Sequence, residues 1–124
     1  MSGKLVLPVL LALPLLTGCG ETCQSTCTHV YDPAECGVVI PGSPTDKLVG
    51  DCVRQCERAL STPGDIGTYE PMSRNPGADL DLETDQQAAA WIDCVWEVAP
   101  EPGPQESCSE LDPAIGGKCA PIPP

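Results

Sequence analysis

Nine cysteines in 124 residues constrain this chain more than any other feature. The sequence has no Phe, two Trp and two Tyr, so the large side chains that normally fill a core are scarce. A chain of this length forms one small domain, and disulfides compensate for a weak core at roughly 2–4 kcal/mol each. An odd number of cysteines cannot all pair within one chain. One cysteine must therefore serve another purpose.

The N-terminus indicates which cysteine is set apart. Lys4 precedes a nearly unbroken apolar run from Leu5 to Leu16. At ~1.5 Å per residue this run spans roughly 18 Å, well short of the ~30 Å hydrocarbon core of a membrane. A charged start, a short apolar run and small residues before the cleavage point are typical of an exported precursor. We therefore expect residues 1–18 to be a signal peptide and not a transmembrane helix.

The residues that end this run, Leu16-Thr17-Gly18-Cys19, resemble the lipobox of bacterial lipoproteins. The resemblance implies cleavage before Cys19 and a diacylglyceryl group on its thiol, usually with an N-acyl chain. Two or three such chains hold a protein almost permanently at a membrane. Gly20 follows Cys19 where Asp would favour the inner membrane, so the resemblance favours the outer membrane. An ordinary secretory peptide is the alternative.

Lipidation of Cys19 makes the number of remaining cysteines even. Eight cysteines allow four disulfides, in 105 connectivities. In the cytosol such a set would suggest metal binding, but in an exported chain disulfides are the default. We expect a short tether over residues 19–22, one disulfide-rich domain over 23–119 and a disordered tail over 120–124. The eight cysteines are Cys23, Cys27, Cys36, Cys52, Cys56, Cys94, Cys108 and Cys119.

Hydrophobic periodicity predicts an all-α domain of three helices with long irregular loops. The first helix, over residues 22–30, has poor intrinsic propensity and is inferred from Cys23 and Cys27, which lie four apart on one helical face. The second, from residue 44 to 60, has Ser43 as a candidate N-cap and Pro44 at its first position. An apolar stripe with spacings of 3, 4 and 7 residues supports it.

The third predicted helix covers residues 85–99. Thr84 and Gln87 have the spacing of a capping box, and Pro100 ends the helix. Between the second and third helices, the segment from Ser61 to Glu83 is rich in Gly and Pro and lacks periodicity. We expect this segment to be a mobile surface loop, with Tyr69 as its only aromatic residue.

The spacings Cys23-x3-Cys27 and Cys52-x3-Cys56 resemble the twin CX3C pattern of disulfide-bonded α-hairpins. The resemblance implies antiparallel helices in which Cys23 pairs with Cys56 and Cys27 with Cys52. It covers only this part of the chain and carries no function. The loop between the two motifs is longer than usual and contains Cys36.

With those pairs made, Cys36 must bond to Cys94, Cys108 or Cys119, and at least one disulfide then ties the hairpin to the C-terminal half. We favour Cys94–Cys108 with Cys36–Cys119. The alternative is Cys36–Cys94 with Cys108–Cys119.

Charge excludes some partners. Without Lys4, five basic residues face eighteen carboxylates, a formal charge of −13. Nucleic-acid binding needs a basic surface, and anionic lipid headgroups attract only basic segments. Membrane contact is therefore expected through the acyl chains on Cys19 alone.

Residues suited to catalysis or metal binding are few. The only histidine, His29, is expected at the surface, and no base beside a nucleophile is evident. Two CX3C pairs could bind zinc as four thiolates, although oxidation competes outside the cytoplasm. The alternating carboxylates from Asp79 to Asp85 lack the Gly and Glu of a calcium-binding loop. We predict no catalytic residue, metal or cofactor.

Two aromatic residues are possible contacts for a partner. Trp96 lies away from the packed face that Trp91 occupies, and we expect it to cover a disulfide or else to be exposed, as Tyr69 is in its loop. The sequence thus predicts a non-enzymatic, lipid-anchored envelope protein that contacts an envelope or extracellular partner. A binder of a small ligand or metal ion is the alternative.

Overall fold

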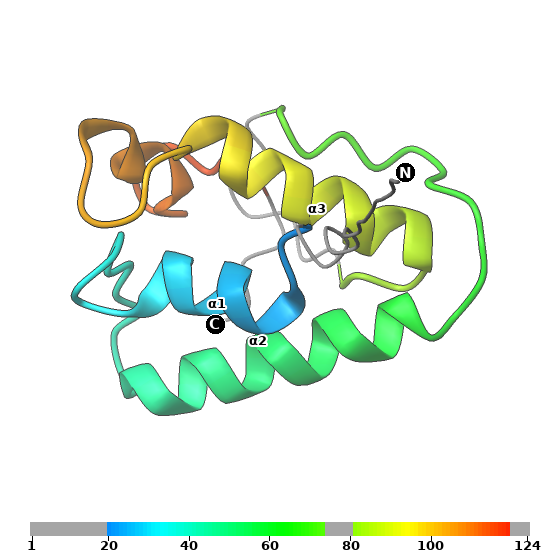
Figure 1. The fold of residues 1–124 in the computed structure, drawn as a ribbon, viewed down its shortest axis with the longest axis horizontal. Helices are drawn as coiled ribbons and strands as arrows, with labels where there is room; N and C mark the ends of the chain where they lie inside the picture. The colour runs from blue at the N-terminus through cyan, green and yellow to red at the C-terminus, as the bar shows by residue number, and fades with distance from the viewer. Residues whose placement is uncertain (1–19, 74–80, 120–124) are drawn as a thin grey trace, which may run out of the picture.

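The structure is a computed structural model that describes residues 20–73 and 81–119. Within these ranges the chain forms three α-helices and one 3-10 helix, with no β-strand, which confirms the predicted all-α class (Figure 1). The predicted signal peptide 1–18, the lipidation site Cys19 and the tail 120–124 lie outside the described residues. The elements are α1 (Cys23–Tyr31), α2 (Thr45–Leu60), α3 (Asp85–Val98) and the 3-10 helix η2 (Glu106–Leu111).

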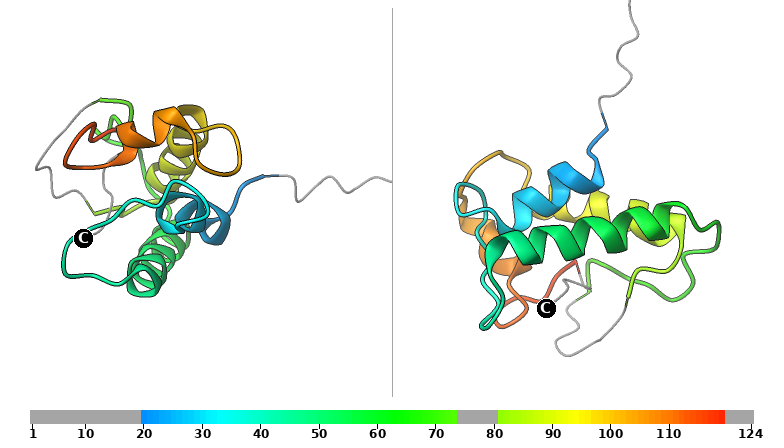
Figure 2. Two further views of the ribbon diagram at one scale, coloured as in Figure 1. Left: turned by 90° about the vertical axis from the view of Figure 1, so that its left-hand side faces the viewer. Right: turned by 90° about the horizontal axis from the view of Figure 1, so that it is seen from below.

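The three α-helices lie side by side in a small bundle (Figures 1 and 2). Helix α2 runs antiparallel to both α1 and α3. Each α-helix contacts the other two, and η2 packs against α3 at the end where α3 finishes. Within the described ranges, no helix is long and apolar enough to cross a membrane.

Helix α1 forms despite its Thr- and Ser-rich sequence because both of its ends and one face are fixed. Thr22 caps the helix: its hydroxyl accepts a hydrogen bond from the Ser25 N–H at 3.0 Å, and the Ser25 hydroxyl accepts one from the Thr22 N–H at 2.9 Å. This reciprocal capping box satisfies two backbone donors. On the inner face, Cys23 and Cys27 bind the helix covalently to α2.

The start of α2 differs from the prediction by one residue. Pro44 is the N-cap, not the first helical residue, and Ser43 makes no cap. Pro44 has extended backbone angles, and its carbonyl accepts the first helical hydrogen bond, from the Leu48 N–H at 3.0 Å. A proline in this position needs no side-chain cap to set the helix direction because its ring already fixes φ.

Helix α3 begins as predicted, with one change in its cap. The Thr84 hydroxyl accepts a hydrogen bond from the Gln87 N–H, but the Gln87 side chain reaches back to the N–H of Glu83, at 2.8 Å, and not to that of Thr84. The helix ends at Val98, immediately before Ala99 and Pro100.

Disulfides form much of the core. The four cysteines of α1 and α2 are at most 3% exposed, and Trp91 of α3 is 1% exposed. The predicted pairs Cys23–Cys56 and Cys27–Cys52 are confirmed, with Cα–Cα distances of 5.7 and 5.9 Å. They fasten the antiparallel helices at two successive turns.

The other two disulfides correct the sequence prediction. Cys36 pairs with Cys108, and Cys94 pairs with Cys119. The favoured prediction, Cys94–Cys108 with Cys36–Cys119, is therefore wrong. The alternative prediction, Cys36–Cys94 with Cys108–Cys119, is wrong as well.

The path of the chain after α3 explains this pairing. The segment after Ala99 turns back over the end of α1, where the Gly103 N–H donates to Glu35 at 2.9 Å, and this brings η2 and Cys108 to Cys36. The chain then returns to α3, where the Trp91 indole N–H donates to the carbonyl of Cys119 at 2.9 Å. Cys119 consequently lies beside Cys94.

Disulfide mapping tests this connectivity. Trypsin and a glutamyl protease cleave between each of Cys36, Cys94, Cys108 and Cys119, so the digested, unreduced protein should release peptides joined as Cys36–Cys108 and Cys94–Cys119. Removing the Cys36–Cys108 disulfide by the double substitution Cys36→Ser and Cys108→Ser should lower the free energy of unfolding by about 4 kcal/mol, because this disulfide closes the largest loop of the four. A peptide joining Cys94 to Cys108 would contradict the fold after α3.

Candidate functional site

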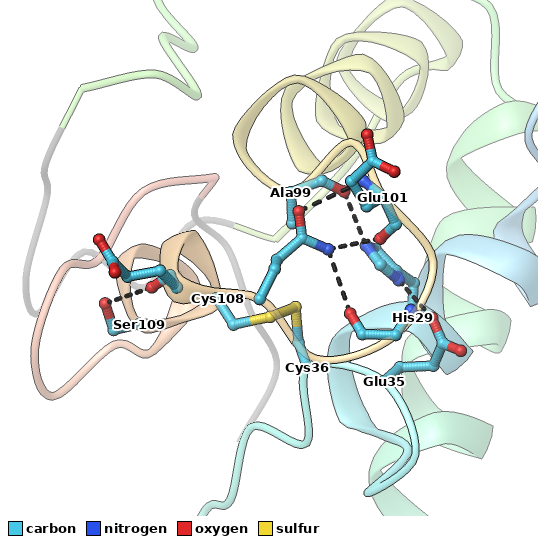
Figure 3. Close-up of a disulfide and its surroundings, with 10 residues drawn as sticks. His29, Glu35, Cys36, Ala99, Glu101, Cys108 and Ser109 are labelled. Carbon is cyan, nitrogen blue, oxygen red and sulfur yellow. Dashed lines mark hydrogen bonds and ion pairs between the residues drawn. A yellow bond between two sulfur atoms is a disulfide. The ribbon is translucent and has the colours of Figure 1, made fainter.

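A buried histidine joins the end of α1 to the end of α3. His29 is 1% exposed, which corrects the expectation that it lies at the surface. Its Nδ1 is 2.7 Å from Glu35 Oε1, and its Nε2 is 2.8 Å from the carbonyl oxygen of Ala99 (Figure 3). We call His29, Glu35, Trp96, Ala99 and Gly103 the His29 cluster.

The hydrogen bonds of the His29 cluster define where its protons lie. The Ala99 carbonyl can only accept, so His29 Nε2 donates to it. The Gly103 N–H and then the His29 imidazole hold the pKa of Glu35 below its ordinary value by hydrogen bonding to the carboxylate. Because an ionised carboxylate also only accepts, Nδ1 donates to Glu35. Both ring nitrogens are therefore engaged in hydrogen bonds.

Trp96 covers the His29 ring. The two rings are stacked, with centroids 4.0 Å apart and planes 8° from parallel. The indole N–H donates to the hydroxyl of Thr26, a buried residue of α1, at 2.9 Å. Trp96 thus covers the imidazole, where we expected it to cover a disulfide.

These contacts make His29 a structural residue in this conformation. Both of its nitrogens are engaged, so neither is available to take a proton from a nucleophile, which a general base must do. The cluster also explains how the segment after α3 is held over α1. Spacing along the sequence could not indicate this, because Trp96 and Ala99 lie about 70 residues from His29 in the chain.

Tyr69 is buried, contrary to expectation. It is 8% exposed, and burial raises the pKa of its hydroxyl above the ordinary value. Within the described segments that hydroxyl has no hydrogen-bond partner. Tyr69 is therefore a core residue of an otherwise irregular segment and offers no exposed ring to a partner.

The outer face of α3 carries a shallow groove of about 690 Å³. Its walls are the exposed parts of α3, the end of α2 and the segment that enters α1. Apolar side chains line its floor and three carboxylates stand around it, which makes it an apolar surface with an acidic rim. We call this the α3 groove; its lining residues are Gly20, Glu21, Leu60, Ala89, Ile92, Asp93, Trp96 and Glu97.

The candidate metal ligands are otherwise engaged. Cys23, Cys27, Cys52 and Cys56, the four thiols that could have bound zinc, are consumed in two disulfides. Across residues 20–73 and 81–119, no group of three or more His, Cys, Asp or Glu is placed to hold a metal ion. Asp79 lies outside these ranges. Of the other carboxylates in its run, Asp81 accepts from Gln55, and Asp85 accepts from the Gly64 N–H.

Comparison with known proteins adds no assignment for these residues. The sequence matches no protein-family model, no curated protein and no solved structure. The candidate site is therefore defined by its own geometry. It consists of the α3 groove and of the His29 cluster, which meet at Trp96.

The His29 cluster predicts a specific acid sensitivity. Since the pKa of Glu35 is lowered in the folded state, the folded protein binds fewer protons there than the unfolded chain, and stability rises with pH in that window. The stabilisation is fully present above the ordinary pKa of about 4.3 and is lost as the pH falls through the lowered value. Glu35→Gln should therefore be less stable than the natural protein at pH 6, and the difference should narrow in acid.

Thermal unfolding followed by circular dichroism from pH 6 to pH 3 measures this difference. Glu97→Gln, which removes an exposed carboxylate of α3 away from His29, is the matched control. It should follow the natural protein at every pH. A Glu35→Gln difference that stays constant over the whole range would show that the carboxylate charge is not what holds the cluster together.

Proposed function

We propose that this protein is a non-enzymatic lipoprotein of the cell envelope, anchored through acyl chains on Cys19, with the outer membrane as its destination. Its disulfide-stapled domain acts by contact with another envelope or extracellular protein, as an interaction or structural module. The proposal combines the resemblance of residues 16–19 to a lipobox with the arrangement of the folded domain.

The observation that carries the proposal is the use of the cysteines. Four disulfides consume eight of the nine cysteines, so Cys19 has no cysteine left within the chain to bond with. It is also the residue that the lipobox resemblance selects for acylation. Four disulfides are in addition typical of an oxidising compartment outside the cytoplasm. Two independent features of the chain thus support export and lipidation.

The beginning of the folded domain supports a position close to the membrane. The capping box of α1 already involves Thr22, and Cys23 is in the first disulfide, so only Gly20 and Glu21 lie between Cys19 and ordered structure. A tether this short keeps the domain near the bilayer. The formal charge of −13 after Cys19 gives the domain no attraction to anionic headgroups.

A contact role is supported by rigidity and by the state of the histidine. Four disulfides hold the surface of a small domain in one shape, which lowers the entropic cost of binding. His29 is engaged at both nitrogens, so it supports no general-base chemistry. The size of the α3 groove, about 690 Å³, also falls in the range of small-ligand sites, which favours the binding of a small apolar ligand as a second candidate function.

Expression of the full chain from Met1 in a bacterial host tests the anchor. The purified protein should begin at Cys19, carry the mass of the acyl groups and partition into detergent. Its other eight cysteines should resist alkylation until they are reduced. Cys19→Ser should lose the acyl mass and the detergent partition while it keeps the disulfides. Protein that retains residue 1 and has free thiols would refute the proposal.

Proximity labelling in intact envelopes tests the contact role. A labelling enzyme fused to the C-terminus of the full chain should enrich particular envelope proteins relative to the same enzyme carried on residues 1–22 alone, because only the full chain has the folded domain. Equal labelling by both fusions would leave the anchor in place and exclude a contact role for the domain.

A further inference from the structure

The α3 groove opens beside the point where the chain enters the folded domain. Gly20 and Glu21, the first described residues, form part of its wall, and Figure 1 shows this segment next to α3. The residue that precedes Gly20 is Cys19, the candidate lipidation site. Consecutive Cα atoms are ~3.8 Å apart, so a group attached to Cys19 starts at the edge of the groove.

The floor of the groove is a continuous apolar stripe. Ala89, Ile92 and Trp96 follow each other at spacings of three and four residues, which places them on one face of α3. Leu60, at the end of α2, extends the stripe and is 43% exposed. The stretch of α3 from Ala89 to Glu97 is about 12 Å long at ~1.5 Å per residue. The groove therefore runs along about two turns of α3.

The rim restricts the chemistry of the occupant. Glu21, Asp93 and Glu97 are exposed carboxylates around the groove. They repel an anionic ligand, whereas a neutral hydrocarbon chain has no charge to repel. No basic residue lines the groove to offset them. Shape and charge therefore both favour an uncharged, elongated apolar group.

We propose that one acyl chain carried on Cys19 lies in the α3 groove. This inference rests on the lipidation proposed above. Attachment at Cys19 makes the binding intramolecular, so the groove competes with the bilayer for the chain without the translational cost of capturing a free ligand. The groove accommodates part of one chain. The remaining chains stay in the bilayer, and two chains suffice for stable anchoring.

This placement also orients the domain. A chain that leaves the groove to join the others at Cys19 brings the outer face of α3 and the end of α2 toward the membrane. The loop between α1 and α2, which contains the exposed Val39, joins α2 at the end opposite Leu60 and therefore lies away from the groove. The surface available to a partner protein is consequently the side away from α3.

A photoactivatable fatty acid tests the inference in living cells. Bacteria that express the full chain are fed a diazirine-bearing fatty acid, irradiated before lysis, and the purified protein is digested and sequenced by mass spectrometry. We expect intramolecular crosslinks from the Cys19 acyl group to peptides of α3 or the end of α2. Ala89→Glu should reduce these crosslinks at least about fourfold, the effect of losing the burial of a single methylene.

Val39→Glu is the matched control, because it places the same charge on an exposed apolar residue outside the groove. It should leave the crosslinks unchanged. Ala89 is itself exposed, so its replacement should preserve the fold, and circular dichroism of both variants checks this. Leu60→Glu provides a second groove variant on a different helix and should act like Ala89→Glu.

The outcomes separate this inference from the proposed function. Two results would overturn the inference that an acyl chain lies in the groove: crosslinks to phospholipid only, or equal crosslinks in Ala89→Glu and Val39→Glu. Both results would leave the lipid anchor intact. Protein that carries no fatty-acid label on Cys19 overturns both. Label on Cys19 together with crosslinks that only the groove variants lose supports both.

Discussion

Four covalent links replace the core that this chain cannot build from large side chains. The sequence has no Phe, and the cysteines of α1 and α2 occupy the positions where two helices would otherwise need a packed seam. With those helices fixed, α3 needs only one well-packed face, centred on the buried Trp91. Each link acts mainly by restricting the unfolded chain, so the fold depends more on oxidation than on apolar area.

The fold also depends on a cluster of polar contacts. The His29 cluster holds the segment after α3 in place: Glu35 accepts from Gly103, and His29 donates to Ala99. The same segment delivers Cys108 to Cys36. This cluster of hydrogen bonds defines one arrangement of the segment. Here it selects which cysteines meet. Trp96 connects this polar cluster to the α3 groove, so both parts of the candidate site share one side chain.

Local sequence signals were enough for the helices and for half of the disulfides. Cys23 and Cys27 share a helical face, and so do Cys52 and Cys56, so their pairing follows once two helices are antiparallel. The pairing of Cys36, Cys94, Cys108 and Cys119 was not accessible, because it depends on the course of irregular segments held by single hydrogen bonds. The burial of His29 was missed because Trp96 and Ala99, which cover and bind its ring, are distant in the chain, and that of Tyr69 because its segment has no hydrophobic periodicity. The α3 groove could not be predicted, because it depends on the position of the end of α2 beside α3.

The way the four bonds divide the chain has one more consequence. Two lie entirely before residue 61, and Cys94–Cys119 lies entirely after residue 84, so Cys36–Cys108 alone crosses the long connection between α2 and α3. A protease that nicks this connection yields two fragments joined by one sulfur–sulfur bond. The N-terminal fragment keeps its double staple, and the C-terminal fragment keeps its own ring. Release of the C-terminal fragment would then require a reductant as well as a cut.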